Sequence, residues 1–402
     1  MITRLSSRVF IIIVAVLVLA AGVYIYLRLP SPSTHKTHRV DVTQPHMKPT
    51  SFVVGRVVPH TVTPAPKKSA PQGPATTGNG SSSVGSASLG GGGSPCPSAA
   101  SPYGFTVVNV DSSLLSIYSQ MDVCWARFQI HVSSIQSGSG SYNWSELDAV
   151  VSTLNAAHIH IDIPIQCFPP PGGGNDQCFT NPVEPTPQQM AAFATQIATR
   201  YNGKNGHGFI DAYEIGNEEY EFYPDSTYGP ILQAGYQAIK AASPQAIVGM
   251  YGPFISSLSR TTATFTTIFS GGYGRYMDFM NFHYYNQGLD PSTTDGDRPS
   301  FDLKWQTIHS IAARYGFANL PIWVTETGWT TTPLSGRAAV TPQQQAQYLQ
   351  YVTNEAAHSG VVQKVFWFTV DDGNQGNTIY PPSGPLPAFY ALQSYIRQNP
   401  AW

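Results

Sequence analysis

Two patterns of hydrophobic and polar positions alternate from about residue 103 to the C-terminus. Short apolar runs predict eight strands, at residues 104–110, 123–130, 160–165, 212–215, 246–251, 277–283, 322–325 and 364–368. Between them, apolar residues recur every three to four positions and predict helices at 144–157, 186–201, 230–242, 302–315 and 342–359. Strands that alternate with helices predict a parallel sheet, and eight strands are the number that closes a (β/α)₈ barrel.

A doubly wound open sheet is the alternative α/β fold. It is disfavoured because no Gly-rich phosphate loop follows the first predicted strand. Two of the predicted helices begin with a Thr-Pro pair, at Thr186 and Thr341, which is a typical helix start. We therefore expect a (β/α)₈ TIM barrel over residues 96–402.

The first 28 residues have a different pattern. Arg4 and Arg8 precede an unbroken apolar run at 9–27, and such a run at 1.5 Å per residue nearly spans a hydrocarbon core of ~30 Å. Because no clear small-x-small cleavage site follows, residues 1–28 are predicted to be a transmembrane signal anchor that places the rest of the chain outside the cytoplasm. The alternative is a cleaved signal peptide, which would make the protein secreted.

Residues 29–95 are dominated by Pro, Ser, Thr, Gly and His and contain few large apolar residues. Such a segment cannot bury enough surface to offset the entropy cost of ordering it. It is predicted to be a disordered linker between the membrane and the barrel.

All four cysteines lie beyond the apolar segment. An even number of cysteines in an exported chain favours disulfide bonds. Cys167 and Cys178 flank a Pro- and Gly-rich stretch, so the favoured pairing joins them, and Cys96 then pairs with Cys124; the two other connectivities stay open. A zinc site is less favoured because no CxxC or HxxxH spacing is present.

Composition narrows the class of ligand. The net charge is −2, which argues against nucleic-acid partners. Only 11% of residues are charged and 12% are aromatic, against ~25% charged residues in average soluble domains. Such a surface suits a neutral, hydroxyl-rich ligand, although exported proteins in general often have this composition.

The chemically distinctive motifs all fall near the ends of predicted strands. The fourth strand runs into Glu-Ile-Gly-Asn217-Glu218, and the seventh into Thr-Glu326-Thr-Gly-Trp329. In a barrel, the loops that follow the strands build the active site. Further candidates near strand ends are Trp125, Arg127, His283, Tyr285 and Trp367.

Two carboxyl groups on opposing strand ends are what glycoside cleavage requires. One must be protonated to donate to the leaving oxygen, and the other must be ionised to attack the sugar or to activate water. Glu218 and Glu326 are the candidates for this pair. No metal ion or organic cofactor is required for this chemistry.

The Asn-Glu after strand four and the Thr-Glu-Thr-Gly-Trp after strand seven resemble clan A glycoside hydrolases, with family 39-type bacterial enzymes the most similar. The resemblance implies that Glu218 is the acid/base and Glu326 the nucleophile of a retaining double displacement. Many members carry Trp before the Asn-Glu pair, whereas this chain has Gly216.

The resemblance also implies roles for the surrounding residues. Asn217 would bind the sugar 2-hydroxyl, Arg127 would support the nucleophile, and Tyr285 would hydrogen-bond it. Trp367 would form the floor of the subsite for the reacting sugar, and Trp125 and Trp329 would stack on sugar rings. Structural alternatives stay open: Arg127 as an ion-pair partner in the barrel, His283 as a hydrogen-bonded structural residue, and the aromatic residues as core packing.

The leading functional hypothesis is therefore a retaining glycoside hydrolase that acts on a β-linked poly- or oligosaccharide, with a monomeric catalytic domain. A transglycosylase that remodels cell-wall or exported glycan would use the same residues. A non-catalytic glycan-binding barrel is the third possibility, and it would be expected to lack one of the two carboxylates. The predicted separation of the two carboxyl groups is about 5–5.5 Å.

Overall fold

The computed structural model describes residues 96, 100–136, 140–169, 183–218, 224–333, 338–370 and 376–402. The predicted anchor at 1–28 and the predicted linker at 29–95 lie outside these residues. Among the helices of the described ranges, none is long and apolar enough to cross a membrane.

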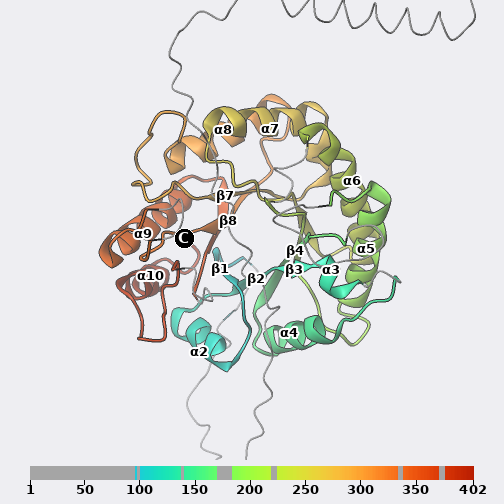
Figure 1. Ribbon diagram of the computed structural model, residues 1–402, viewed down its shortest axis with the longest axis horizontal. Helices are drawn as coiled ribbons and strands as arrows, with labels where there is room; N and C mark the ends of the chain where they lie inside the picture. The colour runs from blue at the N-terminus through green and yellow to red at the C-terminus, as the bar shows by residue number, and fades with distance from the viewer. Residues whose placement is uncertain are drawn as a thin grey trace, which may run out of the picture. The chain divides into compact units, whose positions relative to one another are not determined.

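The core of the domain is a parallel sheet that curls into a nearly closed barrel inside a ring of helices (Figure 1). Its eight strands follow the order β6-β5-β4-β2-β1-β9-β8-β7, with the short β3 paired to β4. The strands are β1 (Tyr103–Val107), β2 (Trp125–Phe128), β3 (Ile130–His131), β4 (His160–Gln166), β5 (Ala212–Ile215), β6 (Ile247–Gly249), β7 (Met280–Tyr284), β8 (Ile322–Thr327) and β9 (Val362–Trp367). The predicted (β/α)₈ barrel is confirmed, and each of the eight predicted strands overlaps an observed one.

The helices of the described ranges lie outside the sheet. They are α2 (Ser112–Met121), α3 (Val132–Ile135), α4 (Ser145–Ala156), α5 (Pro187–Arg200), α6 (Asp225–Ala242), α7 (Leu258–Ser270), α8 (Phe301–Arg314), α9 (Pro342–His358) and α10 (Pro387–Gln398). The two Thr-Pro starts are confirmed: Thr186 and Thr341 each form a capping box with Gln three residues later, and proline occupies the first helical turn. Each cap satisfies N–H groups that the first turn of a helix leaves without partners.

One seam of the barrel is closed by side chains. Strands β6 and β7 do not pair as a ladder, and they end the strand order at its two extremes. Across this seam, Asp278 N donates to Val248 O at 2.7 Å, and Asp278 Oδ2 accepts from Val248 N at 2.9 Å. One step along, Met250 N donates to Asn281 Oδ1 at 2.9 Å. Two polar side chains thus supply bonds that a backbone ladder supplies elsewhere in the barrel.

Alternation along each strand separates an inner core from an outer core. On β1, Tyr103 and Phe105 point outward and pack against Trp367 of β9. Gly104 points inward, and a Cβ there would lie only 2.4 Å from the Phe366 ring, so glycine is needed where Phe366 fills the barrel. The inner cluster of apolar residues is Cys96, Cys124, Trp125, Ala212, Phe279, Trp323 and Phe366.

The cysteines differ in part from the predicted pairing. Cys167 is disulfide-bonded; its predicted partner, Cys178, lies outside the described residues. Cys96 and Cys124 do not form the predicted disulfide: both are buried thiols, and Cys96 Sγ donates to Val123 O at 3.3 Å. The sequence correctly indicated that these two residues are neighbours, since a hydrogen bond from Cys96 is the largest influence lowering the pKa of Cys124. Proximity alone does not require a covalent bond.

Candidate active site

The two candidate carboxylates lie at the carboxyl ends of strands on either side of the seam. Glu326 is the fifth residue of β8, and Glu218 follows β5 by three residues. Chemistry at this end of a barrel is the rule, because the loops after the strands converge there. Both residues therefore stand where the sequence analysis placed them.

Arg127 of β2 lies at the centre of a polar network inside the barrel. This network occupies the upper half of the barrel, which is the half at the carboxyl ends of the strands. The Arg127 side chain is fully buried. Its guanidinium donates to both oxygens of Glu214, at 2.9 and 2.8 Å, to Glu326 Oε1 at 2.6 Å and to Asn217 Oδ1 at 2.6 Å. Burial alone would lower the pKa of Arg127, but Glu214 and Glu326 outweigh it, and the pKa is raised. The guanidinium is therefore a permanent cation between two carboxylates.

Glu326 accepts hydrogen bonds on both of its oxygens. Oε1 accepts from Arg127 at 2.6 Å and from Gln129 Nε2 at 2.8 Å, and Oε2 accepts from the Tyr285 hydroxyl at 2.8 Å. These three donors fix the orientation of the carboxyl group. Arg127 and Tyr285 lie beside Glu326, as predicted from the sequence, whereas Gln129 was not among the predicted site residues. Its signal was present: Gln129 lies two residues beyond Arg127, on the same face of an extended chain.

Glu218 has a different environment. Its side chain is 21% exposed against 6% for Glu326, and its Oε1 lies 2.6 Å from His283 Nδ1. The same nitrogen is 3.7 Å from Glu326 Oε2. An oxygen of Glu218, a ring nitrogen of His283 and an oxygen of Glu326 all lie within 4.8 Å of one another. The buried imidazole thus stands between the two carboxyl groups.

These three residues are also the one group in the described ranges whose ligand atoms are close enough together to hold a metal ion. The hydrogen bond between Glu218 and His283, the bonds of Glu326 to Arg127, Gln129 and Tyr285, and their common place at the carboxyl ends of the strands give a sufficient reason for the cluster. An acidic group paired with a neighbouring imidazole is common in proteins without a metal.

A buried acidic side chain that was not predicted as a site residue lies deeper in the barrel. Asp162 of β4 is fully buried, and its strand pairs with β5, which carries Glu214. Burial and the neighbouring Glu214 raise the pKa of Asp162 well above its usual range. The side chains that pair directly with Arg127 are those of Glu214 and Glu326.

Gly216 explains why this chain departs from the Trp that many clan members carry. Its φ is +94°, in the left-handed region that side chains rarely adopt. The backbone turns here from β5 into Asn217 and Glu218. A tryptophan at this position would be strained, so the local path of the chain requires glycine.

The three tryptophans do not form the predicted sugar platforms. Trp125 is the first residue of β2, two residues before Arg127, and therefore lies ~6–7 Å deeper in the barrel, at its opposite end. Trp367 has the opposite parity to the inward-facing Phe366, points outward and donates to Thr353 of α9 at 3.3 Å. The interpretation of both as mouth residues was wrong.

Trp329 does follow the carboxyl end of β8, but only 2% of it is exposed. Its indole N–H donates to Asn286 Oδ1 at 2.9 Å and to Leu289 O at 3.1 Å, and its ring packs on Tyr348 of α9. It supports the loop after β7 and presents almost no surface to a ligand. The aromatic rings in contact with Tyr285 near the nucleophile candidate are those of Phe254 and Phe368.

Known proteins share features of this chain, both in sequence and in fold. The model of the family described as glycosyl hydrolase catalytic core matches residues 235–389, which include β7, β8, β9 and Glu326. A search of curated proteins finds no match.

Several solved structures share the fold. A family 39 glycoside hydrolase from Bacteroides cellulosilyticus WH2 has a TM-score of 0.58 at 16% identity, over 73% of this chain and 63% of that one. A glucosidase from Croceicoccus marinus has a TM-score of 0.55 at 15% identity, over 73% and 66%. Fungal β-1,4-galactanases reach 0.54 at 16% identity, over 73% and 94%. The chain thus spans less than two thirds of the length of the first two structures. Residues 235–389 thus match the model of a glycosyl hydrolase catalytic core, and the solved structures share the barrel fold.

Proposed function

We propose that the protein is a retaining glycoside hydrolase that cleaves a neutral, β-linked glycan by double displacement. The observation that carries this proposal is the short gap between the two carboxyl groups, whose oxygens approach within 4.8 Å. Retaining enzymes hold their carboxyl groups ~5–5.5 Å apart, whereas inverting enzymes leave ~6.5–9.5 Å for a water molecule. The gap between Glu218 and Glu326 favours direct attack by a carboxylate.

Glu326 is the proposed nucleophile. Arg127, Gln129 and Tyr285 all donate to it, which fixes its orientation for attack. In the first step, a Glu326 oxygen forms a bond to the anomeric carbon as the glycosidic bond breaks. In the second step, water replaces Glu326 on that carbon, and the configuration of the sugar is retained.

Glu218 is the proposed acid/base. Its greater exposure lets it exchange protons with solvent, and His283 holds one of its oxygens at 2.6 Å. Glu218 protonates the leaving oxygen in the first step and takes a proton from the attacking water in the second. His283 orients the carboxyl group through both steps.

Asn217 is proposed to bind the sugar hydroxyl next to the reacting carbon. Its Oδ1 accepts from Arg127 at 2.6 Å, which fixes the direction of the amide. The NH₂ group of the same amide is the proposed donor to the 2-hydroxyl. Hydrogen bonds to this hydroxyl strengthen as the transition state forms.

The charge of the site favours a neutral substrate. Around the reacting centre, the network described above contains one guanidinium, Arg127, and two carboxylates that pair with it, Glu214 and Glu326, beside Glu218, which carries the proton to be donated. A polyanionic glycan would be repelled from such a cluster. The β-linkage is proposed from the resemblance to clan A enzymes, and β-1,4-galactanases are among the proteins that share the fold.

The test is the stereochemistry of hydrolysis. Neutral polysaccharides are screened for release of reducing ends, and the first-formed anomer of the product is identified by ¹H NMR. Retention is expected, and inversion would overturn the proposal. Oligosaccharides longer than the substrate would instead identify the enzyme as a transglycosylase with the same residues.

Two variants test the assignment of roles. Glu326→Gln is expected to abolish turnover. Azide is expected to restore part of the activity of Glu218→Ala but not of Glu218→Gln, because the small anion can enter only the space that alanine leaves. Wild-type rates in either Glu218→Gln or Glu326→Gln would show that the assignment is wrong.

The apolar segment at residues 1–28 is proposed to anchor the enzyme in the membrane, with the barrel on the extracytoplasmic side. This proposal rests on the length and flanking charges of that segment. Membrane fractionation of the full chain tests it. Recovery of the enzyme in the medium without residues 1–28 would show instead that the segment is a cleaved signal peptide.

A further inference from the structure

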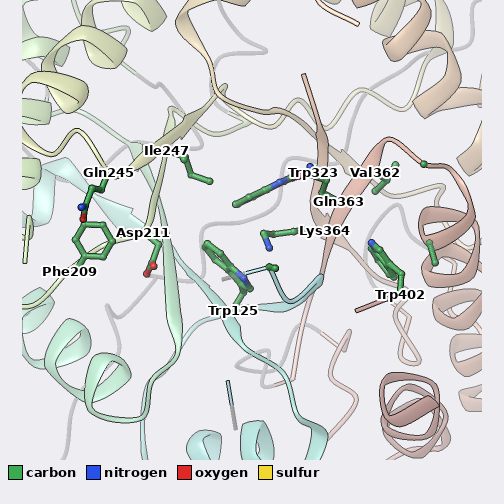
Figure 2. A pocket seen from close by; sticks show the side chains of 13 residues that line it. Trp125, Phe209, Asp211, Gln245, Ile247, Trp323, Val362, Gln363, Lys364 and Trp402 are labelled. Carbon is green, nitrogen blue, oxygen red and sulfur yellow. The ribbon is translucent and has the colours of Figure 1, made fainter. Parts of the chain in front are cut away.

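A cavity of about 490 Å³ lies at the end of the barrel opposite the candidate carboxylates. Trp125, Ile247 and Val362 in its lining are the first residues of β2, β6 and β9, and Trp323 is the second residue of β8. The cavity therefore opens at the amino-terminal ends of the strands, and Figure 2 shows Trp125, Trp323 and Lys364 at its centre, with the other labelled side chains around them. Its volume falls within the ~300–1,000 Å³ of small-molecule sites.

The lining combines aromatic and polar groups. Trp125 and Trp323 form the buried floor, and the half-buried rings of Phe209 and Trp402 stand at opposite sides (Figure 2). The polar members of the lining are Asp211, Gln245, Gln363 and Lys364. Gln245 and Gln363 are exposed, and so both amides can reach a molecule that enters from solvent.

The two charged groups of the cavity are both engaged with the protein. Asp211 Oδ1 lies 2.8 Å from His160 Nδ1, and its other oxygen accepts from a backbone N–H at 2.9 Å. Lys364 Nζ donates to Ser101 O at 2.7 Å and lies 4.5 Å from the centre of the Trp125 ring. A charged ligand would be repelled by whichever of these two groups carries a charge of the same sign. A purely apolar ligand would remove the water from both of them without replacing its hydrogen bonds.

We propose that this cavity is a second saccharide-binding site, which takes a neutral mono- or disaccharide unit independently of the catalytic site. Sugars present C–H faces that pack on aromatic rings and hydroxyls that both donate and accept hydrogen bonds. The lining offers both kinds of surface: rings at Phe209 and Trp402, and amides at Gln245 and Gln363. A glycan held here would keep the enzyme on its polymer while the opposite mouth acts on another segment.

Lys364 provides a way to distinguish a neutral ligand from an acidic one. Burial lowers the pKa of Lys364 to about 7, against the opposing influence of Cys124, Asp211 and Asp162. An acidic ligand would bind more tightly as the pH falls through 7, because the ammonium form would pair with it. Binding of a neutral saccharide is expected to change less than about twofold between pH 6 and pH 8.

The experiment uses the full chain carrying Glu326→Gln, so that no probe is consumed. Cellobiose, laminaribiose and galactobiose are the neutral probes, and glucuronate and glucosamine are the charged ones. The readout is the ¹H–¹⁵N signals of the indoles, with those of Trp323 and Trp402 assigned by Trp323→Phe and Trp402→Phe. At least one neutral disaccharide is expected to shift these two signals in a saturable way.

Gln245→Ala/Gln363→Ala is expected to weaken this binding by about tenfold, the loss of roughly one hydrogen bond at each position. The control, Gln188→Ala/Gln347→Ala, replaces two exposed glutamines on helices α5 and α9 and is expected to leave binding unchanged. The proposal is overturned if no neutral probe shifts the two signals, if the cavity pair has no effect, or if glucuronate binds more tightly than every neutral probe. Because the readout is binding in an inactivated enzyme, failure here would leave the proposed hydrolysis untouched.

Discussion

The two halves of the barrel interior shift the pKa of a buried cationic side chain in opposite directions. In the upper half, Arg127 lies between Glu214 and Glu326, and its pKa is raised. In the lower half, the ammonium of Lys364 lies over the rings of Trp125 and Trp323, and its pKa is lowered to about 7. Both side chains are almost fully buried. The comparison teaches that the partners of a buried charge decide its state, since the depth of burial is nearly the same.

The same strands build both halves. β2 contributes Trp125 below and Arg127 above, and β8 contributes Trp323 below and Glu326 above. On β2, a step of two residues keeps the side chain on the inner face and raises it by ~6–7 Å. On β8, the step from Trp323 to Glu326 is three residues, and the pairing of this strand with β7 and β9 shifts register along the same stretch. A few residues along one strand therefore separate an aromatic floor from an ionised network.

The largest expected effect comes from removing the upper cation. Arg127→Met would leave Glu214 and Glu326 buried without a compensating charge. We expect the free energy of unfolding to fall by about 3–5 kcal/mol and turnover to be lost, as measured by chemical denaturation and by initial rates. Arg127→Lys, which keeps the charge but loses the forked geometry, should recover part of the stability. If Arg127→Met were as stable as the wild type, the two buried carboxylates would not depend on the charge of Arg127, and the proposed contrast between the two halves would be wrong.

The matching substitution in the lower half should behave differently. Lys364→Met is expected to keep wild-type turnover, because Lys364 lies at the end of the barrel away from the carboxylates. Since the folded-state pKa of Lys364 is about 7 and the usual lysine value is ~10.4, the unfolded chain binds more protons than the folded one between these values. The wild type should therefore gain stability relative to the variant as the pH rises from 7 towards 10, by up to ~1.4 kcal/mol per pH unit.

Denaturation midpoints of the wild type and Lys364→Met at pH 6, 7, 8 and 9 measure this effect. A difference between the two proteins that stays constant over this range would show that Lys364 is a normal ammonium. The upper and lower cations would then be alike.

A smaller effect is expected from a single donor to the nucleophile candidate. Tyr285→Phe removes the hydroxyl that donates to Glu326 Oε2, and kcat/KM should fall by about tenfold, the value of one charged hydrogen bond. Tyr284→Phe is the matched control, since the neighbouring hydroxyl points outward to backbone oxygens of Pro291 and Pro299. Equal losses of activity in both variants would show that the effect is one of folding and not of the site.

The smallest effect concerns Asp162, whose pKa is raised by burial and by Glu214. Above pH 4, the folded chain keeps this proton while the unfolded chain loses it, so that the residue costs stability as the pH rises. Asp162→Asn should therefore match the wild type within about 1 kcal/mol at pH 4 and be the more stable of the two at pH 7. Thermal unfolding at both pH values measures this, and a variant less stable at pH 7 would mean that Asp162 is ionised.

Much of the fold could be read from the sequence, because each strand is a short apolar run and the helices have clear periodicity. The positions of the two candidate carboxylates were also readable, since Asn-Glu and Thr-Glu-Thr-Gly-Trp stand at strand ends. The pattern alone did not show how far along the barrel axis a strand residue lies, nor whether its side chain points into the barrel or out of it. Trp125 and Arg127 share a face but lie at different heights, and Trp367 faces away from its neighbour Phe366.

The remaining errors have the same origin in three-dimensional placement. Gln129 follows Arg127 at the right spacing, but nothing in the sequence says that β8 carries its partner Glu326 to the same height. Cys96 and Cys124 do come together, yet as two thiols. Sequence spacing predicts which groups can meet, whereas the packing around them decides what they form.

The seam between β6 and β7 lies between the strands that lead to the two candidate carboxylates. On one side of it, β5 leads to Glu218, and on the other β8 carries Glu326. Around the sheet, the shorter route between β5 and β8 therefore crosses the part of the barrel that the side chains of Asp278 and Asn281 help to hold together. We expect heating to widen this gap before the helices melt, so that activity falls at a lower temperature than the far-ultraviolet circular dichroism signal. In such an enzyme, the thermal limit of catalysis would be set by two side chains that never touch the substrate.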